Sequence, residues 1–344
     1  MRPTTRDIAK AAGVSLATVD RVLNGRPRVS PAAVEAVNAA IRDLGFVRNI
    51  SAANLAKSKI YRFQFLLPKA GDQFLETVIE RIEEAREALR SELVDISFRR
   101  EIETDPHQIS HFLSSITIND VDGIALMAPE SPQVRDATTR LRERGVQVVL
   151  FVSGQPGVHD FDFVGLDNSA AGATAGRLMG RFSGRRTGEV LVVTDTMNAR
   201  DSLERRHGFD LVATRDFPNL KTLPSIETYG DIERTRTVIR DAYSSHPNII
   251  GAYVLNSEAR LALESIAAAP HPQPQILIAH ERTHFSERLL VDGKLDAVIA
   301  QNPGHLVRSA IRVLRARCDN RTPIASQEEI RIEILLSENL GLQG

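Results

Sequence analysis

From residue 61 onward, short apolar runs alternate with amphipathic helical segments, and this alternation constrains the fold more than any other feature of the chain. Ten runs rich in Val, Ile, Leu and Phe predict strands at 62–68, 94–100, 121–128, 146–152, 161–167, 188–195, 249–255, 275–280, 295–302 and 330–336. Segments with helical periodicity lie between several of them, at 76–89, 134–144, 170–183 and 233–245. Strands that alternate with helices predict parallel sheets in an α/β fold. Ten strands divide naturally into two sheets, and we place the division near 163–172.

The N-terminal segment 1–48 carries helix boundary signals instead of strand signals. Three short helices are predicted, each with a capping residue before it and a glycine after it: the N-caps are Thr4 or Thr5, Ser15 and Ser30, and the stops are Gly13, Gly25 and Gly45. Two helices separated by AGVS, with a third closing the core, are typical of a helix-turn-helix. A three-helix cap on an enzyme would have the same spacing, so the spacing alone leaves both interpretations open.

The predicted second helix points Leu16 and Ala17 outward. In the major groove of DNA their apolar tips contact base edges and thymine methyl groups, and Arg21 reaches guanine acceptors. Short side chains with hydrogen-bond donors suit phosphate oxygens, which fix the register of a protein on DNA: these are Ser15, Thr18 and Asn24.

Charge is distributed unevenly along the chain. Residues 1–59 hold ten Lys or Arg and four Asp or Glu, a formal charge of +6, whereas the whole chain has a formal charge of −1. The remaining residues therefore sum to −7. A basic arm on an acidic body indicates that one end contacts a polyanion, although many basic N-terminal segments are only solvated.

Composition and missing motifs limit the other function classes. One cysteine, Cys318, excludes an internal disulfide framework and fits a reducing compartment. The sequence has no run of 18 apolar residues and no apolar secretory signal at its N-terminus, so we expect a cytoplasmic protein. It has no G-x-G-x-x-G after a strand, no Walker loop, no G-x-S-x-G and no H-E-x-x-H, so we expect no cofactor and no metal.

Residues 13–49, GVSLATVDRVLNG followed by VSPAAVEAVNAAIRDLGFVRN, resemble the N-terminal domain of the lactose-repressor (LacI/GalR) family of bacterial transcription regulators. The resemblance implies a helix-turn-helix DNA-binding domain at 1–48 in which Leu16, Ala17 and Arg21 face bases. It also implies a set of residues that hold the phosphate backbone: Thr4, Ser15, Thr18, Asn24, Ser30 and Asn49. Asp20 departs from the family, which usually has a phosphate-contacting serine there. A carboxylate near phosphate is repulsive unless it pairs with a cation or accepts from a cytosine amino group, and we favour pairing with Arg21 or another basic residue.

Residues 49–59, NISAANLAKSK, resemble the hinge of the same family. That hinge orders on operator DNA, pairs with its dimer mate and drives a leucine into the minor groove; here the leucine is Leu55, with Ala52 beside it. A helix of about six residues is too short to be stable alone in water, and an apolar wedge of this kind bends DNA. The alternative is a plain linker whose Leu55 packs on the next domain. Arg48 replaces the family's usual proline before Asn49.

The body, 60–344, resembles the sugar-binding periplasmic-protein fold that this family uses as its effector domain. The segments that carry the resemblance are DQFLETVIERIEEA, VGLDNSAAGATAGRL, SLERRHGF, VLNSEARLAL and DAVIAQNPGHL. They imply two subdomains, about 60–164 with 294–325 and about 165–293 with 326–344, joined by three chain crossings. A small polar ligand, a sugar or a sugar derivative, would lie in the cleft, in contact with Phe74, Asp167, Arg205, Asn256, Glu281 and Gln301. Arg205 would donate two hydrogen bonds to a pair of ligand oxygens, as its planar guanidinium suits, and Phe74 would form an apolar wall.

Three positions depart from the family's pocket. Ile232 stands where members often have an aromatic ring over the ligand, and Ser257 replaces the acid that often follows Asn256. Glu281 stands where the family tends to have aspartate, which is one methylene shorter. The pocket remains polar, but its ligand does not follow from the resemblance.

These observations predict a ligand-responsive, sequence-specific transcription regulator that acts as a repressor. It would bind a pseudo-palindromic operator as a homodimer, since the chain has no C-terminal leucine heptads for a coiled-coil tetramer. Two alternatives belong to other classes. A periplasmic-type sugar-binding protein shares the body but has a signal peptide and no helix-turn-helix, and an α/β enzyme using His280, Glu281 or Asp195 would need a nucleophile or cofactor motif.

Overall fold

The computed structural model describes residues 3–23, 27–46, 60–102, 105–154, 162–270 and 275–341. The chain forms two compact units, Met1–Lys59 and Ile60–Gly344. Each unit is described by itself.

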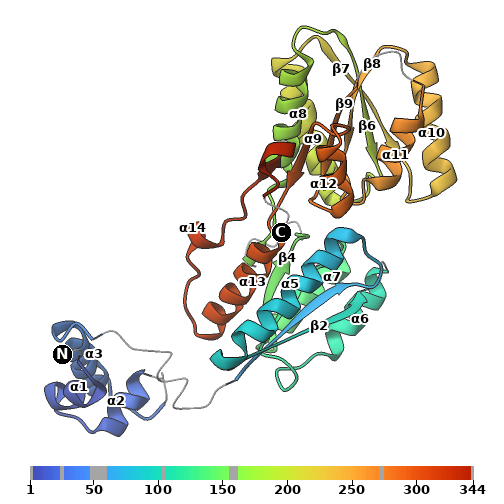
Figure 1. Cartoon of the computed structure of the whole chain (residues 1–344). Helices are drawn as coiled ribbons and strands as arrows, with labels where there is room; N and C mark the ends of the chain where they lie inside the picture. The colour runs from blue at the N-terminus through green and yellow to red at the C-terminus, as the bar shows by residue number, and fades with distance from the viewer. Residues whose placement is uncertain are drawn as a thin grey trace. The chain divides into compact units, whose positions relative to one another are not determined.

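The smaller unit contains the three predicted helices, which are α1 (Thr5–Ala12), α2 (Leu16–Leu23) and α3 (Pro31–Asp43). Thr4 and Asp7 form a capping box at the start of α1, and Gly13 ends it in the left-handed conformation with φ 65°. The Ser30 side chain accepts a hydrogen bond from the Ala33 amide at the start of α3. The fully buried side chains in this unit come one from each helix: Ile8, Val19 and Val37. This shared core fixes the crossing of the helices that Figure 1 shows.

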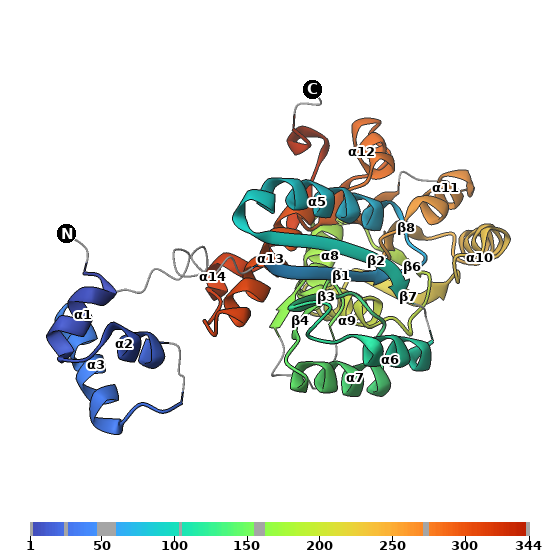
Figure 2. The same cartoon turned by 90° about the horizontal axis from the view of Figure 1, so that it is seen from below.

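The first lobe of the larger unit is built on a parallel sheet in the order β2-β1-β3-β4-β5. Its strands are β1 (Tyr61–Pro68), β2 (Val94–Ile102), β3 (Gly123–Leu126), β4 (Gln147–Phe151) and β5 (Asp162–Val164). Its helices are α5 (Gln73–Leu89), α6 (Pro106–Ser115), α7 (Pro132–Glu143) and α13 (Pro303–Cys318), with the short η1 (Arg90–Glu92) and α14 (Ala325–Glu328). Figure 2 shows α5 on one side of the sheet and α6 with α7 on the other. Separate buried clusters lie on the two sides, one including α5 and α13 and the other including α6 and α7.

The second lobe is built on a sheet in the order β11-β10-β9-β8-β6-β7, parallel except where β11 pairs antiparallel with β10. Its strands are β6 (Gly188–Thr194), β7 (Leu220–Glu227), β8 (Ile249–Val254), β9 (Ile276–His280), β10 (Ala297–Ala300) and β11 (Glu333–Leu335). Its helices are α8 (Asn168–Ser183), α9 (Arg200–Asp216), α10 (Ile232–Ser245), α11 (Arg260–Ala268) and α12 (His284–Val291), with the short η2 (Ser337–Asn339). Two layers of helices therefore enclose a largely parallel sheet in each lobe, which is the predicted architecture.

The predicted subdomain boundary at 294 is wrong. Residues 297–300 form β10, which pairs with β9 and β11 inside the second sheet, so the second lobe extends to Ala300. The chain returns to the first lobe only with α13. Residues after 325 also stay with the first lobe for one more turn, because Glu328 on α14 pairs with Arg312 on α13 at 2.6 Å. The three expected crossings therefore fall near 165–167, 301–302 and 329–332.

Each of the ten predicted strands overlaps an observed strand, but β7 was not predicted. Its sequence, LKTLPSIE, carries Pro224, which has no amide hydrogen for a ladder. The strand exists because it is at the edge of the sheet, where one side needs no ladder partner. The register between β6 and β7 shifts between Val190 and Val192, opposite the proline.

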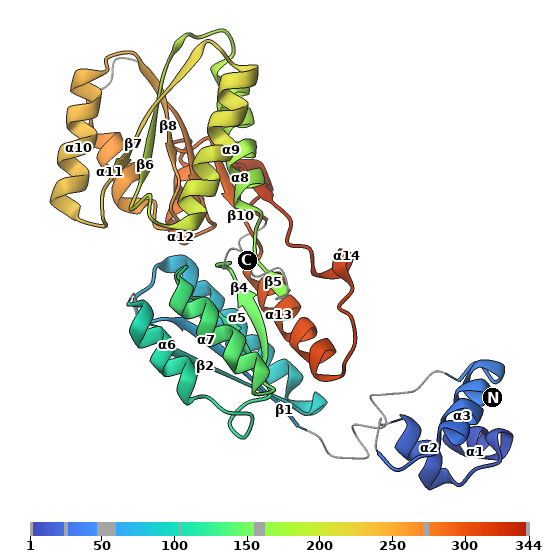
Figure 3. The same cartoon turned by 180° about the vertical axis from the view of Figure 1, so that it is seen from behind.

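Helices α8 and α9 pack with their backbones in close approach, side by side in Figures 1 and 3. A Cβ atom at Gly172 would lie 1.9 Å from the carbonyl oxygen of Arg205, and one at Gly208 would lie 1.9 Å from that of Ser169. Only glycine leaves room at both places. This packing holds the start of α8 against the part of α9 that carries Arg205.

Candidate functional site

The exposed side of α2 carries residues predicted to contact DNA bases. Val19 is fully buried, so the opposite side of the helix faces solvent. Leu16 is 47% exposed on that side, and Ala17 and Arg21 are also exposed. Asp20 is exposed as well, and its pairing stays a prediction. The helix thus presents apolar and cationic groups together, as contact with base edges requires.

A hollow of about 290 Å³ lies beside the N-termini of α2 and α3. Four predicted contacts with DNA line it, namely Ser15, Thr18, Arg21 and Ser30, and Arg28 joins them. Helix N-termini and guanidinium groups both favour an anion. Sequence reasoning missed Arg28; its signal was a cation two residues before the N-cap of a helix.

The other predicted DNA contacts fall in two groups. Thr4 is described, and its hydroxyl donates to Asp7 Oδ2 at 2.7 Å while it caps α1. The whole predicted hinge, 49–59, lies outside the described residues, as do the following predicted contacts: Asn24, Asn49, Ala52 and Leu55.

Arg205 on α9 is 4% exposed, and its guanidinium lies inside the second lobe. Nε donates to Asn168 Oδ1 at 2.8 Å, and Nη1 donates to the Leu255 carbonyl at 2.6 Å. Nη2 lies 3.6 Å from Glu281 Oε1. One side chain therefore joins the start of α8, the end of β8 and the end of β9.

Glu281 follows β9 with φ 64° and is 1% exposed. Its Oε1 accepts from Gln301 Nε2 at 3.0 Å. Burial raises the pKa of Glu281 to about 7, against the opposing charge of Arg205. Glu281 Oε2 and Gln301 Oε1 are buried and have no hydrogen-bond partner in the described part of the chain.

Asn256 and Asp195 form a second polar pair at the ends of β8 and β6. Asn256 Nδ2 donates to Asp195 Oδ2 at 3.2 Å, and the Thr228 hydroxyl donates to Asp195 Oδ1 at 2.8 Å. Burial raises the pKa of Asp195, and the charge of Asp72 raises it further. Asn256 Oδ1 is buried without a hydrogen-bond partner among the residues described.

Polar contacts connect the lobes. The Ser257 hydroxyl donates to Asp72 Oδ2, and Arg200 Nη1 lies 3.4 Å from Glu130 Oε2. The other Asp72 oxygen accepts from the Leu75 amide at 2.9 Å and so caps α5. An acid at 257, as the family often has, would repel Asp72, so the serine makes this contact between the lobes possible.

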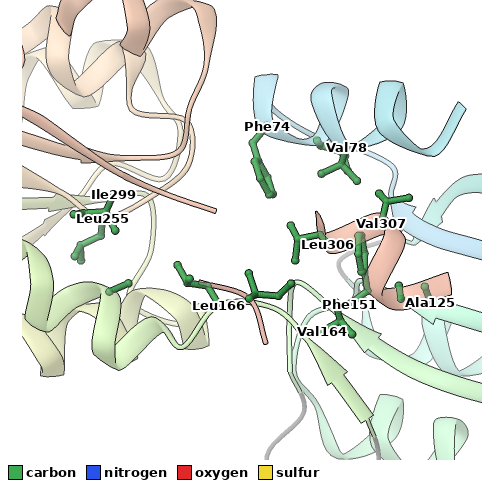
Figure 4. Packing of buried hydrophobic residues seen from close by; sticks show 14 of the residues in the cluster. Phe74, Val78, Ala125, Phe151, Val164, Leu166, Leu255, Ile299, Leu306 and Val307 are labelled. Carbon is green, nitrogen blue, oxygen red and sulfur yellow. The ribbon is translucent and has the colours of Figure 1, made fainter. Parts of the chain in front are cut away.

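A cavity of about 840 Å³ lies between the lobes, with walls from the ends of β3 and β4, the start of α8 and the first turn of α9. Asp167 lines it, and so does Asn168, whose oxygen is held by Arg205. The cavity therefore adjoins the buried polar cluster. Of the other predicted ligand contacts, Phe74 is 3% exposed and belongs to the buried apolar cluster that Figure 4 shows, together with Leu306.

His280 is fully buried, and its Nε2 shares a hydrogen bond of 2.6 Å with the Tyr253 hydroxyl. Burial lowers the pKa of His280 well below its usual range, and the charge of Arg205 adds to this effect. The imidazole is therefore neutral and enclosed in the core of the second lobe. Within the described ranges, no three His, Cys, Asp or Glu side chains gather as metal ligands would, and no helix has the length and apolarity needed to span a bilayer.

A helix-turn-helix unit joined to a two-lobed α/β unit with a polar cleft defines the class of bacterial regulatory proteins with a binding-protein-like body. Residues 63–322 match the family described as "Periplasmic binding protein domain". Residues 4–49 match "Bacterial regulatory proteins, lacI family". The chain belongs to the periplasmic binding protein domain family and carries the N-terminal domain of the lacI family, as the resemblance in its sequence implied.

Individual relatives agree with this assignment. The maltose regulon regulatory protein MalI of Escherichia coli (strain K12) is 33% identical over 168 residues, 49% of this chain and 47% of that protein. The chain spans about half the length of the curated relatives it matches. Among solved structures, GanP, a glucose-galactose binding protein from Geobacillus stearothermophilus, matches with a TM-score of 0.70 at 16% identity, over 83% of this chain and 100% of that one. A solute binding protein from Burkholderia graminis in complex with D-arabinose matches with a TM-score of 0.72 at 20% identity, over 82% of this chain and 97% of that one. At these identities the structures show the fold alone.

Proposed function

We propose that this chain is a transcriptional repressor that binds operator DNA through α2 and responds to a small polar metabolite bound between the two lobes. The observation that carries the proposal is the presence, in one chain, of a helix-turn-helix with an exposed reading face and of a cavity between two lobes that is lined by polar and charged side chains. MalI, to which the chain is similar, is named for its regulation of the maltose regulon.

The DNA contact is supported by the division of α2 into two kinds of group. Leu16, Ala17 and Arg21 are exposed on one face, where they suit base edges. The hollow with Ser15, Arg28 and the N-terminus of α3 suits a phosphate oxygen. The two sets would contribute specificity and affinity respectively. Because each chain has one reading helix, a homodimer would read a pseudo-palindromic site with one half-site per chain. Residues 49–59 would be the hinge between the DNA-binding unit and the ligand-binding unit.

The response to a ligand is supported by the polar groups that face each other across the lobes. Closing the lobes brings Asp72 and Glu130 of the first lobe to Ser257 and Arg200 of the second. A ligand that binds one lobe arrangement better than another shifts the population of that arrangement, and so changes the affinity for DNA by the same coupling free energy. We place this protein in the cytoplasm, where it would meet both DNA and metabolite.

The test is selection of bound sequences from a pool of randomised duplexes by the purified full-length chain. We expect enrichment of one pseudo-palindrome and a steep fall of affinity with salt. Arg21→Ala should weaken the free energy of operator binding by about 1–3 kcal/mol and relax the base preference at one position of each half-site. Arg28→Ala should weaken binding to all sequences alike and reduce the salt slope by about 1.

Arg42→Ala, which removes an exposed cation from the far end of α3, is the charge-matched control. It should leave the selected sequence unchanged and alter the affinity less than Arg28→Ala does. A pool without any enriched sequence would refute the proposed function. Equal effects of all three substitutions would refute the assignment of the two faces.

A further inference from the structure

The first lobe covers a polar cluster at the carboxyl ends of the strands in the second sheet. Four residues of this cluster follow strands β6, β8, β9 and β10: Asp195, Asn256, Glu281 and Gln301. Asp72 of the first lobe reaches this edge of the sheet and accepts a hydrogen bond from the Ser257 hydroxyl. Phe74 belongs to one buried apolar cluster with Leu255 and Ile299 of the second lobe, as Figure 4 shows. Closure of the lobes therefore removes this edge of the second sheet from water.

Closure also gathers three carboxylates around one guanidinium group. Burial raises the pKa of both Asp195 and Glu281, and the charge of Asp72 across the lobes raises it further. Arg205 Nη2 lies 3.6 Å from Glu281 Oε1, and no other cation forms an ion pair with these three carboxylates within the described ranges. Like charges held together away from water favour the neutral form of one of them.

Glu281 is the most deeply buried of the three carboxylates, at 1% exposed. Its Oε1 accepts from Gln301 and faces Arg205, whereas its Oε2 has no hydrogen-bond partner among the described residues. An ionised carboxylate would therefore keep a charged oxygen unsolvated, which costs free energy. A proton on Oε2 removes that charge, and the closed arrangement accordingly favours the neutral form of Glu281.

The other titratable neighbours of Glu281 do not change this balance. His280, just before it in the chain, is fully buried and neutral. Arg282, just after it, forms its ion pair with a residue of α12 instead. Of the elements packed against Glu281, α9 supplies the cation Arg205, and the start of α5 supplies the anion Asp72. Glu281 therefore titrates against one cation of its own lobe and one anion of the other lobe.

We propose that closure of the two lobes is linked to the uptake of one proton from water by Glu281, so that the larger unit closes more readily as the pH falls. The proton would lie on Oε2, the oxygen without a partner in the described part of the chain. The inference rests on the proposed function only in that closure is the step that a metabolite would control. It is tested without DNA and without a metabolite.

The direction of the effect follows from the two arrangements. When the lobes separate, water reaches the Glu281 carboxyl and Asp72 moves away, so the pKa of Glu281 falls from about 7 toward its ordinary value of 4.5. Between these values the closed arrangement holds a proton that the open one has released. The ratio of closed to open molecules should therefore fall as the pH rises, by roughly tenfold from pH 6 to pH 8.

Distances between spin labels on the two lobes measure closure directly. Ser114→Cys on α6 and Thr237→Cys on α10 place the labels at exposed positions, and Cys318→Ser removes the native thiol. Figure 3 shows α6 and α10 on the side of the larger unit away from α13, which follows one of the chain crossings, so separation of the lobes changes their distance. Pulsed electron paramagnetic resonance of the full-length chain then gives the ratio of closed to open molecules at pH 6, 7 and 8.

Two variants test the assignment of the proton. Glu281→Gln has nearly the same size but cannot ionise, so its ratio of closed to open molecules should be the same at pH 6 and pH 8. Asp72→Asn removes the facing charge, and asparagine can still cap α5 at the Leu75 amide. At pH 8, where Glu281 is ionised, Asp72→Asn should raise the ratio at least about threefold above that of the native chain.

Two control variants should keep the native pH dependence. Ser257→Ala removes the hydrogen bond to Asp72 without changing a charge, so it should lower the ratio by the same factor at every pH. Asp296→Asn removes a carboxylate at the amino end of β10, the opposite edge of the sheet, where Asp296 accepts from the Leu277 amide at 2.7 Å. It should leave both the ratio and its pH dependence unchanged.

The outcomes are distinct. A ratio that does not change with pH, including a single distance at all three pH values, overturns the inference, and so does a native pH dependence in Glu281→Gln. If the melting temperature shows that Glu281→Gln is not folded, an unchanged ratio at pH 8 in Asp72→Asn overturns the inference instead. Each of these results leaves the proposed function standing, because that function fails only if the chain selects no operator.

Discussion

Replacing Gly172 by alanine should destabilise the second lobe. The added Cβ would lie 1.9 Å from the carbonyl oxygen of Arg205, whereas ordinary contact begins at 3.4 Å, so α8 and α9 must move apart to admit it. The neighbouring atom belongs to the backbone and cannot rotate away. We expect an overpacking cost of about 3 kcal/mol, at the top of the usual range, offset by about 1 kcal/mol from the better helix propensity of alanine. The net loss is about 2 kcal/mol.

Calorimetric melting of the full-length chain measures this loss. At about 2–4 °C per kcal/mol for a domain of this size, the main transition should fall by roughly 4–8 °C. Gly304→Ala is the matched control, because it is also a helical glycine but its added Cβ would approach Arg308 Nη1, the free end of a flexible side chain, at 2.9 Å. The control should melt at the native temperature or slightly above. Equal melting of the two variants would refute the claim that the backbones of α8 and α9 are in contact.

Three further predictions concern buried groups. Tyr253→Phe removes the hydrogen-bond partner of His280 Nε2 and should lower the free energy of unfolding, measured with urea, by about 1–3 kcal/mol. The control is Tyr229→Phe, at a residue 60% exposed, which should leave that free energy unchanged. Glu281, whose pKa burial raises to about 7, holds a proton in the folded state that the unfolded chain releases above about pH 4.5. As the pH rises from 4.5 to 7, the free energy of unfolding of the native protein should therefore fall by up to about 3 kcal/mol relative to that of Glu281→Gln. Parallel plots of unfolding free energy against pH for the two proteins would contradict this. Val37→Ala leaves a gap in the core of the small unit and should lower its free energy of unfolding by about 2 kcal/mol. The helical circular dichroism of that unit should then be lost at a lower temperature than in the native protein.

The fold was predictable where local pattern and tertiary contact agree. Capping residues such as Ser30 fixed the helix starts, and runs of branched apolar residues located the strands of both sheets. The pattern failed at β7, because Pro224 is a local signal against a strand and only its position at the sheet edge removes the objection. The strand at 295–302 was also predicted, but the resemblance assigned it to the wrong subdomain, because β10 pairs with β9, which precedes it in the chain by the whole of α12, and no local pattern identifies that partner.

The candidate site was less predictable, for the same reason. The resemblance implied Arg205 as a ligand contact, but spacing cannot show that its donors find the carbonyl of Leu255, which lies beyond two further strands and a helix in the chain. Phe74 was expected as a wall of the cleft, and its burial in an apolar cluster depends on α13, which the chain reaches only after building most of both lobes. Arg28 was missed because its place beside Ser15 depends on the path of the loop before α3.

The return of the chain to its first lobe has a consequence for synthesis on the ribosome. The five strands of the first sheet are complete at Val164, but α13, which covers one face of that sheet, begins only at Pro303. About 140 residues must be translated in between, which takes roughly 7–28 s at ordinary elongation rates. During that time the apolar face that Leu306, Ile311 and Leu314 later cover is open to water. The first lobe therefore cannot finish folding before most of the second has been made, and one face of its sheet lacks its covering helix throughout that interval.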